Sequence, residues 1–349
     1  MSKYISDKFS GLKEYVPGEQ PQDKKYIKLN TNESPYPPSD KVVEAVNSAE
    51  VKDLRLYCDP DCNKLKKALA DLYCTNKENI FLSNGSDDIL NFAFMVYGHM
   101  GAVFADITYG FYSVFAQLHG VDAEIIPLKD DFTLDIKAFM GKNKLVVIAN
   151  PNAPTGIALD LKTIEDIIVS NPDGVVLIDE AYVDFGGESS AKLTEKYDNL
   201  LVCQTFSKSR SLAGGRLGFA IANKEIIADL EKIKYSTNPY NINRLTQVAG
   251  LATVLDDGYY KENCQKIIET RNFVISELQQ LGFEILPSKA NFIFAKSDKI
   301  SGKKLYEELK EKGVLVRHFD NEKICDYNRI TIGSREEMEV FIEKVKEIL

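Results

Sequence analysis

A lysine and the polar residues around it are the side chains best suited to chemistry in this sequence. Lys208 follows Thr205 and Ser207 and stands shortly before Arg216. Two hydroxyls and a guanidinium suit a bound phosphate, because the planar fork of arginine matches two phosphate oxygens. A single lysine is by default a surface residue, but one beside an anion site can act as an amine nucleophile. We therefore predict that Lys208 is catalytic and that the other three residues bind an anion.

An acidic residue ends an apolar run upstream of this lysine. The run covers residues 176–178 and is followed directly by Asp179. Continuous apolar runs are typical of strands buried on both faces, which places Asp179 at a strand end. In such a setting of low dielectric constant, a carboxylate can hold a cationic ring nitrogen firmly. A carboxylate that caps a neighbouring helix is the structural alternative.

A glycine-containing turn supplies a third group. Gly85, Ser86 and Asp87 precede a predicted helix, so their free backbone N–H groups lie at its positive end and can bind phosphate. Helix capping by Ser86 or Asp87 is compatible with this role. An amine, a carboxylate and a phosphate pocket are the groups that pyridoxal 5'-phosphate requires, because it forms an imine with a lysine and pairs its ring nitrogen with an acid.

The order of these motifs resembles that of fold type I pyridoxal-phosphate enzymes, and the rest of the chain is similar to the histidinol-phosphate aminotransferase family. The similarity extends nearly end to end. It is carried further by Tyr15-Val16-Pro17-Gly18, Leu29-Asn30-Thr31-Asn32-Glu33-Ser34-Pro35, Arg55-Leu56-Tyr57, Pro154-Thr155-Gly156 and Arg329-Ile330-Thr331-Ile332-Gly333. The resemblance implies an α/β fold, with a mixed, mostly parallel sheet flanked by helices in a large domain and a smaller α+β domain.

The resemblance also implies cofactor contacts. Tyr182 would hydrogen-bond the phenolic oxygen of the cofactor, and Tyr109 would stack on its ring. Tyr57 would reach the cofactor phosphate of a neighbouring subunit, which implies a homodimer with shared sites. The family commonly has asparagine where this chain has Ala153, whose side chain donates no hydrogen bond. We expect this loss to leave the phenolic oxygen a stronger partner for the imine proton, unless Asn152 turns inward as a substitute.

Substrate contacts follow from the same resemblance. Arg317 and Arg329, at the ends of adjacent predicted strands, match family arginines that bind the anionic end of the substrate. Tyr15 and Asn32 of the N-terminal arm are candidates to close over it. The implied reaction is transamination between L-histidinol phosphate and 2-oxoglutarate, a step of histidine biosynthesis. Threonine-phosphate decarboxylation, aromatic amino acid transamination and cofactor binding without turnover remain alternatives, because no motif reports which bond at Cα is broken.

Composition argues against several other classes of protein. With 349 residues, of which 44% are hydrophobic, the chain can form more than one core. Its formal net charge of −9 disfavours binding to nucleic acid or to an anionic membrane surface. The N-terminal residues do not resemble a signal peptide and no apolar run reaches membrane-spanning length, so we expect a cytoplasmic protein. Cysteines and histidines lack metal-ligand spacing, so we expect reduced thiols and no metal.

Apolar runs alternate with predicted helices through the middle of the chain, which indicates a mostly parallel sheet. Ligands bind at the carboxyl ends of such strands, where Asp179 and Lys208 both fall. The pattern changes to helix near residue 241, and residues 314–317 and 328–332 are predicted strands beyond it. We therefore expect an N-terminal arm at residues 1–40, a large cofactor-binding domain at 41–240 and a small α+β domain at 241–349.

Overall fold

The computed structural model, which describes residues 4–47 and 49–349, contains a seven-stranded sheet in the order β2-β8-β7-β6-β5-β3-β4. Strands β3 to β7 pair in parallel, whereas β8 runs antiparallel to both of its neighbours. The bounds are β2 (Ile80–Ser83), β3 (Ala102–Ala105), β4 (Ala123–Ile126), β5 (Leu145–Ala149), β6 (Val176–Asp179), β7 (Leu200–Thr205) and β8 (Gly218–Ala222). The predicted mixed, mostly parallel sheet is confirmed.

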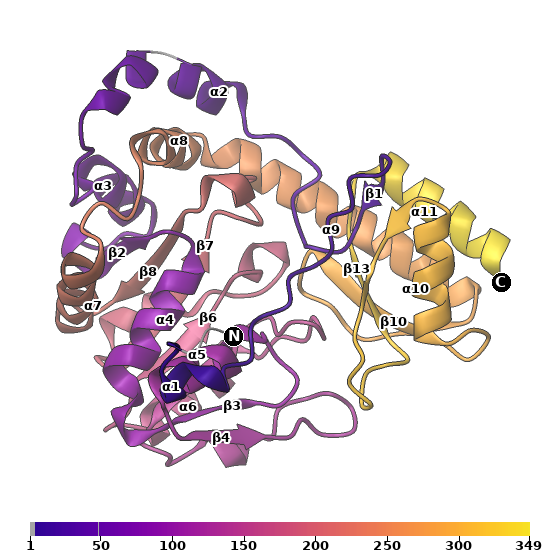
Figure 1. Cartoon of the computed structure of the whole chain (residues 1–349), viewed down its shortest axis with the longest axis horizontal. Coiled ribbons are helices and arrows are strands. Elements are labelled where there is room, and N and C mark those ends of the chain that lie inside the picture. The colour runs from indigo at the N-terminus through magenta and orange to yellow at the C-terminus, as the bar shows by residue number, and fades with distance from the viewer. Residues whose placement is uncertain (1–3, 48) are drawn as a thin grey trace.

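Helices cover both faces of this sheet (Figure 1). On one face, α4 (Ser86–Tyr97), α5 (Phe111–His119) and α7 (Lys224–Thr237) share a core with Leu177 of β6. On the other face, α6 (Leu161–Ser170) packs with Val176 and Ile178, and α2 (Asp40–Asn47), α3 (Asn63–Leu72) and α8 (Arg244–Leu255) pack over β2 and β8. Successive residues of β6 thus point into opposite cores, which explains the uninterrupted apolar run before Asp179.

A second, antiparallel sheet forms from the C-terminal part of the chain. Its order is β12-β13-β10-β9, and it shares a core with α9, α10 and α11. The bounds are α9 (Asp257–Gln280), β9 (Phe283–Ile285), β10 (Phe292–Ser297), α10 (Gly302–Glu311), β12 (Arg317–His318), β13 (Asn328–Thr331) and α11 (Arg335–Ile348). Helix α9 runs from the end of α8 toward this sheet (Figure 1).

The single strand predicted for residues 314–317 is wrong, because the segment is divided between two sheets. Its first half, β11 (Val314–Leu315), pairs in parallel with β1 (Ile27–Lys28) of the N-terminal arm. Its second half, β12, pairs with β13. The arm therefore adds a strand beside the C-terminal unit, and a change of hydrogen-bonding partner at Val316 separates the two halves.

The packing of α8 bears on where the chain divides into domains. Ala249 and Val254 of α8 share a core with Ile80 and Phe219 of the large sheet, although the predicted boundary at residue 240 assigns α8 to the small domain. This packing favours a division at the start of α9. The ranges 1–40, 41–240 and 241–349 stay predictions.

Parallel strands β3, β5, β6 and β7 all end at one edge of the large sheet. Asp179 is the last residue of β6, Thr205 is the last residue of β7, and the loop after β7 carries Lys208. The carboxyl ends of parallel strands are the usual place for ligands in such folds. Within the described residues, no helix is long and apolar enough to cross a membrane.

Candidate active site

A cavity of about 870 Å³ lies at this edge. Three parts of the chain form its wall: the N-terminal segment, the loops after the large-sheet strands, and the small sheet. Most predicted site residues line it, namely Tyr15, Asn32, Ser86, Asp87, Tyr109, Asp179, Tyr182, Thr205, Ser207, Lys208, Arg216, Arg317 and Arg329. Residues nearly 300 positions apart in the sequence thus meet around one space, as the bond between Arg329 and Asn30 across 299 positions illustrates.

Asp179 presents a buried carboxylate to the cavity. Only 5% of the residue is exposed, and burial raises the pKa of the carboxyl to about 6 against the lowering effect of its hydrogen bonds. Tyr112 Oη donates to Oδ2 at 2.7 Å, and the backbone N–H of Ala181 donates to Oδ1 at 3.2 Å. A carboxylate fixed in this way can bind a protonated ring nitrogen with little rearrangement, because the charge of that partner would offset its desolvation.

Lys208 brings an amine to the same space. Its Nζ donates to the carbonyl oxygen of Thr31 at 3.1 Å and lies 5.9 Å from the ring centroid of Tyr182. Burial, and then the positive charge of Arg329, lower the pKa of the amine to about 8. A larger share of Lys208 is therefore neutral near pH 7 than for an ordinary lysine, and only the neutral amine is nucleophilic.

The start of α4 forms an anion site with the loops beside it. Gly85 is the N-cap and has no side chain to cap the helix, so the first backbone N–H groups of α4 are available to a ligand. A Cβ atom on Gly218 would lie 2.5 Å from the backbone nitrogen of Ser86, so only glycine lets β8 approach the helix start this closely. Thr205 and Ser207 add hydroxyls that hydrogen-bond each other at 3.0 Å.

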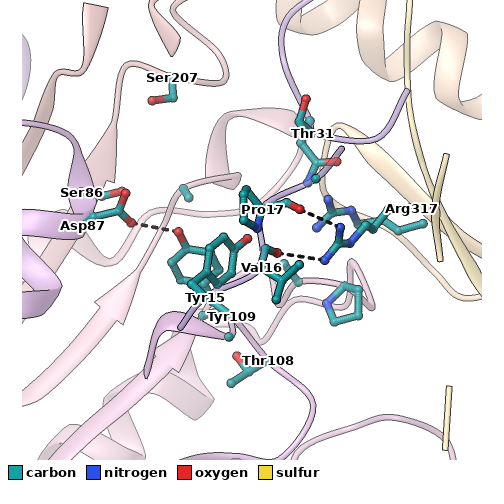
Figure 2. Close-up of a pocket in the computed structure, with 18 of the residues that line it drawn as sticks. Tyr15, Val16, Pro17, Thr31, Ser86, Asp87, Thr108, Tyr109, Ser207 and Arg317 are labelled. Carbon is teal, nitrogen blue, oxygen red and sulfur yellow. Dashed lines mark hydrogen bonds between the residues drawn. The ribbon is translucent and has the colours of Figure 1, made fainter. Parts of the chain in front are cut away.

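Asp87 joins two of the predicted cofactor contacts. Its Oδ2 accepts from Arg216 Nη2 at 3.0 Å. Its Oδ1 accepts from Tyr109 Oη at 2.9 Å (Figure 2). A Cβ atom on Gly85 would lie 2.4 Å from Arg216 Nη2, so glycine at this position makes room for the guanidinium. The carboxylate thereby holds one side chain predicted to clamp a phosphate and one predicted to cover a ring.

Tyr182 and Asn32 belong to one hydrogen-bonded group. Asn32 Nδ2 donates to Tyr182 Oη at 3.0 Å, Thr331 Oγ1 donates to Asn32 Oδ1 at 2.9 Å, and Asn291 Nδ2 donates to the Asn32 carbonyl at 3.0 Å. Asn32 has φ of 57° and is only 1% exposed, so its neighbours fix it in the left-handed region. The arm residue therefore orients the Tyr182 hydroxyl.

Two arginines form the wall contributed by the small sheet. Arg317 and Arg329 are Cα partners in the register of β12 and β13. Arg329 Nη2 donates to the Asn30 carbonyl at 2.9 Å, while its Nε is buried without a hydrogen-bond partner in the described part of the chain. Arg317 Nη1 and Nη2 donate to the carbonyls of Pro17 and Val16 at 3.2 and 3.1 Å (Figure 2). Both guanidiniums retain N–H groups that can meet an anion.

Three predicted residues do not line the cavity. Asn152 is 3% exposed and its amide is already used: Oδ1 accepts from Thr108, and Nδ2 donates to the Ile107 carbonyl and to Thr155. The idea that Asn152 turns inward to replace the missing donor at Ala153 is therefore wrong in this structure. Gly85 is the N-cap of α4 and does not itself line the cavity. Tyr57 is 80% exposed, and its ring stacks on that of Tyr240 with centroids 4.4 Å apart.

Two side chains of the site were missed in the sequence. Tyr112, which donates to Asp179, lies in a helix whose apolar face gives no sign of a polar role. Glu33 lines the cavity, pairs with Lys28 at 2.7 Å, and raises the pKa of Lys208 against the lowering effects of burial and Arg329. Glu33 stands in the motif of residues 29–35, so its position could have suggested it.

Comparisons with known proteins agree with this arrangement. Residues 24–345 match the model of the family described as aminotransferase class I and II. The chain is 52% identical to the histidinol-phosphate aminotransferase of Brachyspira hyodysenteriae over 100% of this chain and 99% of that protein. It is 49% identical to the enzyme of the same name from Clostridium beijerinckii, over 100% of this chain and 98% of that one.

Solved structures share the fold. The histidinol-phosphate aminotransferase of Clostridium acetobutylicum superposes with a TM-score of 0.86 at 24% identity, over 92% of this chain and 98% of that one. The enzyme of the same name from Sinorhizobium meliloti, solved in complex with pyridoxal-5'-phosphate, gives a TM-score of 0.84 at 23% identity, over 93% and 92% of the two chains. At these identities the likeness concerns the fold.

Proposed function

The chain belongs to the class I and II aminotransferase family, and from that premise we propose that it transfers the amino group of L-histidinol phosphate to 2-oxoglutarate. The products are imidazole acetol phosphate and glutamate. Pyridoxal 5'-phosphate is the cofactor. When bound, it supplies an electron sink that stabilises negative charge at the substrate Cα. The relatives that match over the whole chain at about half identity support this substrate.

The cavity contains a side chain for each part of that cofactor. In this proposal, the Asp179 carboxylate holds the protonated ring nitrogen, and the helix start at Ser86 together with Arg216 holds the phosphate. Tyr182 Oη, already oriented by Asn32, donates to the phenolic oxygen. The Lys208 amine would hold the cofactor aldehyde and would carry the proton that leaves the substrate Cα.

The observation that carries the choice of substrate is the pair of guanidiniums on the small sheet. Arg317 and Arg329 lie opposite each other, and carbonyl oxygens are the only acceptors they contact within the described chain. Two like charges close together favour a ligand that brings negative charge between them, and a phosphate ester offers oxygens to both forks. The same pair can receive the side-chain carboxylate of glutamate in the second half of the reaction.

A substrate panel on the purified, cofactor-loaded protein tests the proposal. We expect a keto product from L-histidinol phosphate with 2-oxoglutarate as acceptor. Release of carbon dioxide from threonine phosphate would support the decarboxylase instead. Turnover of phenylalanine or tyrosine, without turnover of either phosphate-bearing amine, would support an aromatic aminotransferase. It would contradict the proposal that the two arginines bind a substrate phosphate. A cofactor spectrum that does not change with any amino donor would indicate binding without turnover.

We also propose a homodimer in the cytoplasm. Tyr57 is a large aromatic residue that is 80% exposed in the single chain, and it lies outside the cavity wall. Leu54 and Leu56 beside it are also half exposed. Such an apolar surface is more stable when it is covered, and a second copy that covers it could place Tyr57 against the cofactor phosphate of its partner. Sedimentation of the wild type and of a Tyr57→Ala variant, with cofactor affinity measured on both, tests this assembly.

A further inference from the structure

The N-terminal segment crosses the mouth of the cavity as residues 11–18, here called the strap. Its residues from Lys13 to Gly18 all contribute to the cavity wall. The strap lies between the two sheets, with the indigo N-terminal end beside α5 and the following chain beside the small sheet (Figure 1). It is therefore fastened to both units of the fold rather than to one.

One glutamine fastens the outer end of the strap. Gln117 on α5 accepts a hydrogen bond from the backbone N–H of Lys13 at 3.0 Å through Oε1. The same amide donates to the Gly11 carbonyl at 2.8 Å through Nε2. Both polar atoms of one side chain thus pair with the backbone on either side of residue 12, in the manner of a strand neighbour. Gln117 itself does not line the cavity.

The middle of the strap places an aromatic side chain over the cavity. Tyr15 stacks on Phe111 with centroids 4.2 Å apart, and its edge meets Tyr109 at 6.1 Å. The side chains of Tyr15 and Tyr109 lie beside each other (Figure 2). The Tyr15 ring also lies close to Gly110, where a Cβ atom would make an ordinary van der Waals contact with it at 3.5 Å.

The inner end is fastened to the small unit. Arg317 donates to the Val16 and Pro17 carbonyls, and Glu19, just beyond the strap, pairs with Lys310 on α10 at 2.5 Å. The strap therefore spans from α5 to the small sheet across the cavity. Its two ends are held by hydrogen bonds from side chains, whereas its own backbone makes no ladder with a strand in the described structure.

We propose that Gln117 and Arg317 are positioning residues, which hold the strap closed and thereby keep Tyr15 over the bound substrate. Neither group needs to touch the reacting atoms for this role. When either is lost, the strap opens more often, because the free energy that keeps a loop closed comes from a small number of such bonds. The proteolytic effect depends only on the chain itself; the kinetic effect described below also rests on the proposed function.

Trypsin reports this opening directly, because Lys13 lies within the strap. In the cofactor-loaded protein, we expect the Gln117→Ala variant to be cleaved after Lys13 roughly tenfold faster than the wild type, since cleavage tracks the open population. Cleavage after the exposed Lys129, in a loop away from the strap, serves as the internal reference and should not change. Gln265→Ala is the matched control, because Gln265 is an exposed helical glutamine whose side chain donates to Glu269 on the same helix.

Arg317→Gln tests the inner end, with Arg335→Gln as its control on α11, where Arg335 pairs with Glu339. We expect faster cleavage after Lys13 in the first variant and an unchanged rate in the second. If Gln117→Ala is cleaved no faster than Gln265→Ala, the strap is not held by Gln117 and the proposal fails. If only Arg317→Gln is unchanged, the assignment of the inner anchor fails.

Kinetics distinguish this inference from the proposed function. We expect Gln117→Ala to raise the KM of the amino donor, because the strap would close over it less often, with little change in kcat, because Gln117 does not line the cavity. If the wild type transaminates as proposed but Gln117→Ala is cleaved no faster than Gln265→Ala, the role of Gln117 in holding the strap is contradicted and the proposed function is not. If Gln117→Ala is cleaved faster but the wild type turns over none of the amino donors, the role of Gln117 is supported and the proposed function is contradicted.

Discussion

Arg329 faces Arg317 across β12 and β13 and also acts on Lys208. After burial, its positive charge is the main influence that lowers the pKa of the Lys208 amine to about 8. Burial lowers the pKa of Arg329 itself, yet a guanidinium stays protonated at any working pH. One arginine can therefore serve both to attract an anion and to keep the nearby amine partly neutral.

The first prediction concerns the pH dependence of Lys208. A lowered pKa means that the amine becomes neutral and nucleophilic as the pH rises through about 8 rather than through 10.5. We expect the rate at which cofactor-free protein captures the cofactor aldehyde to rise with a midpoint near pH 8. In Arg329→Gln the midpoint should move to higher pH. Borohydride trapping across a pH series measures both, and a midpoint in Arg329→Gln equal to that of the wild type would contradict the assigned influence.

A second prediction follows from the buried carboxyl of Asp179. Its pKa rises from 3.8 to about 6 on folding, so its contribution to stability is present below about pH 4 and is lost as the pH rises through about 6. The loss corresponds to about 3 kcal/mol. Cofactor-free Asp179→Asn, which stays neutral, should therefore unfold at higher urea than the wild type at pH 8, and the difference should vanish near pH 4.

Bound cofactor should reverse the order of stability of the wild type and Asp179→Asn at neutral pH. The cationic ring nitrogen pairs with the wild-type carboxylate but finds no charge on asparagine, so the cofactor should stabilise the wild type far more than the variant. Urea unfolding with and without pyridoxal 5'-phosphate makes the comparison. If cofactor-free Asp179→Asn is less stable than the wild type at pH 8, the buried charge of Asp179 does not destabilise the folded protein and the prediction is wrong.

The main features of this site could be predicted because they depend on local sequence. Asp179 ends an apolar run and Lys208 follows the next buried strand, so the topology of a parallel sheet is enough to bring them to one edge. A helix does follow Gly85, but it begins at Ser86, two residues earlier than predicted, so Ser86 and Asp87 belong to its first turn. In each case a residue suited to the chemistry lies within a few positions of the end of a strand or the start of a helix, so a short stretch of sequence is enough to place it.

The remaining features depend on contacts that no local pattern reports. The bond from Tyr112 to Asp179 requires α5 to pack against the end of β6, across 67 positions of sequence. The hydrogen bond from Gln117 to the Gly11 carbonyl spans 106 positions. Gln117 is an exposed glutamine on a helix, and nothing in the sequence distinguishes it from any other solvated residue. The inward turn considered for Asn152 fails because Thr108 and Ile107, which arrive from another loop, use its amide.

The third prediction concerns the anchor of the lysine loop. Arg210, two residues after Lys208, pairs with Asp257 at the start of α9 at 2.9 Å, and the side chains are only 8% and 16% exposed. Asp257→Asn removes the carboxylate that is paired with the buried Arg210 guanidinium, while the negative charge of Asp184 still acts on it, so the free energy of unfolding should fall by about 1–3 kcal/mol. It should also slow the capture of cofactor by Lys208, because the loop and α9 lose their common anchor.

The neighbouring acid provides the control for that pair. Asp256 pairs with Lys41, whose side chain is 67% exposed, so solvent can replace the interaction. We expect Asp256→Asn to change stability far less than Asp257→Asn and to leave cofactor capture unchanged. Equal losses in the two variants, measured by urea unfolding, would mean that the buried pair has no special role.

The last prediction concerns Ala153, which packs with Ala290, Phe292 and Tyr182 at the cavity wall. An asparagine there would add an amide donor to the part of the cavity wall that Tyr182 also lines, where both could donate to the phenolic oxygen of the cofactor. We expect Ala153→Asn to lower the pH midpoint of the visible absorbance of the cofactor-loaded protein, because the added donor stabilises negative charge on that oxygen. The larger polar side chain in an apolar cluster should also cost about 1–3 kcal/mol of stability.

Asn152→Ala separates these two effects. The substitution removes the hydrogen bonds that Asn152 makes with Thr108, Thr155 and the Ile107 carbonyl, which should cost a similar amount of stability. Asn152 does not line the cavity, so the absorbance midpoint should stay at the wild-type value. A midpoint that moves in Asn152→Ala, or one that stays fixed or rises in Ala153→Asn, would mean that loosened packing rather than a missing donor sets the titration.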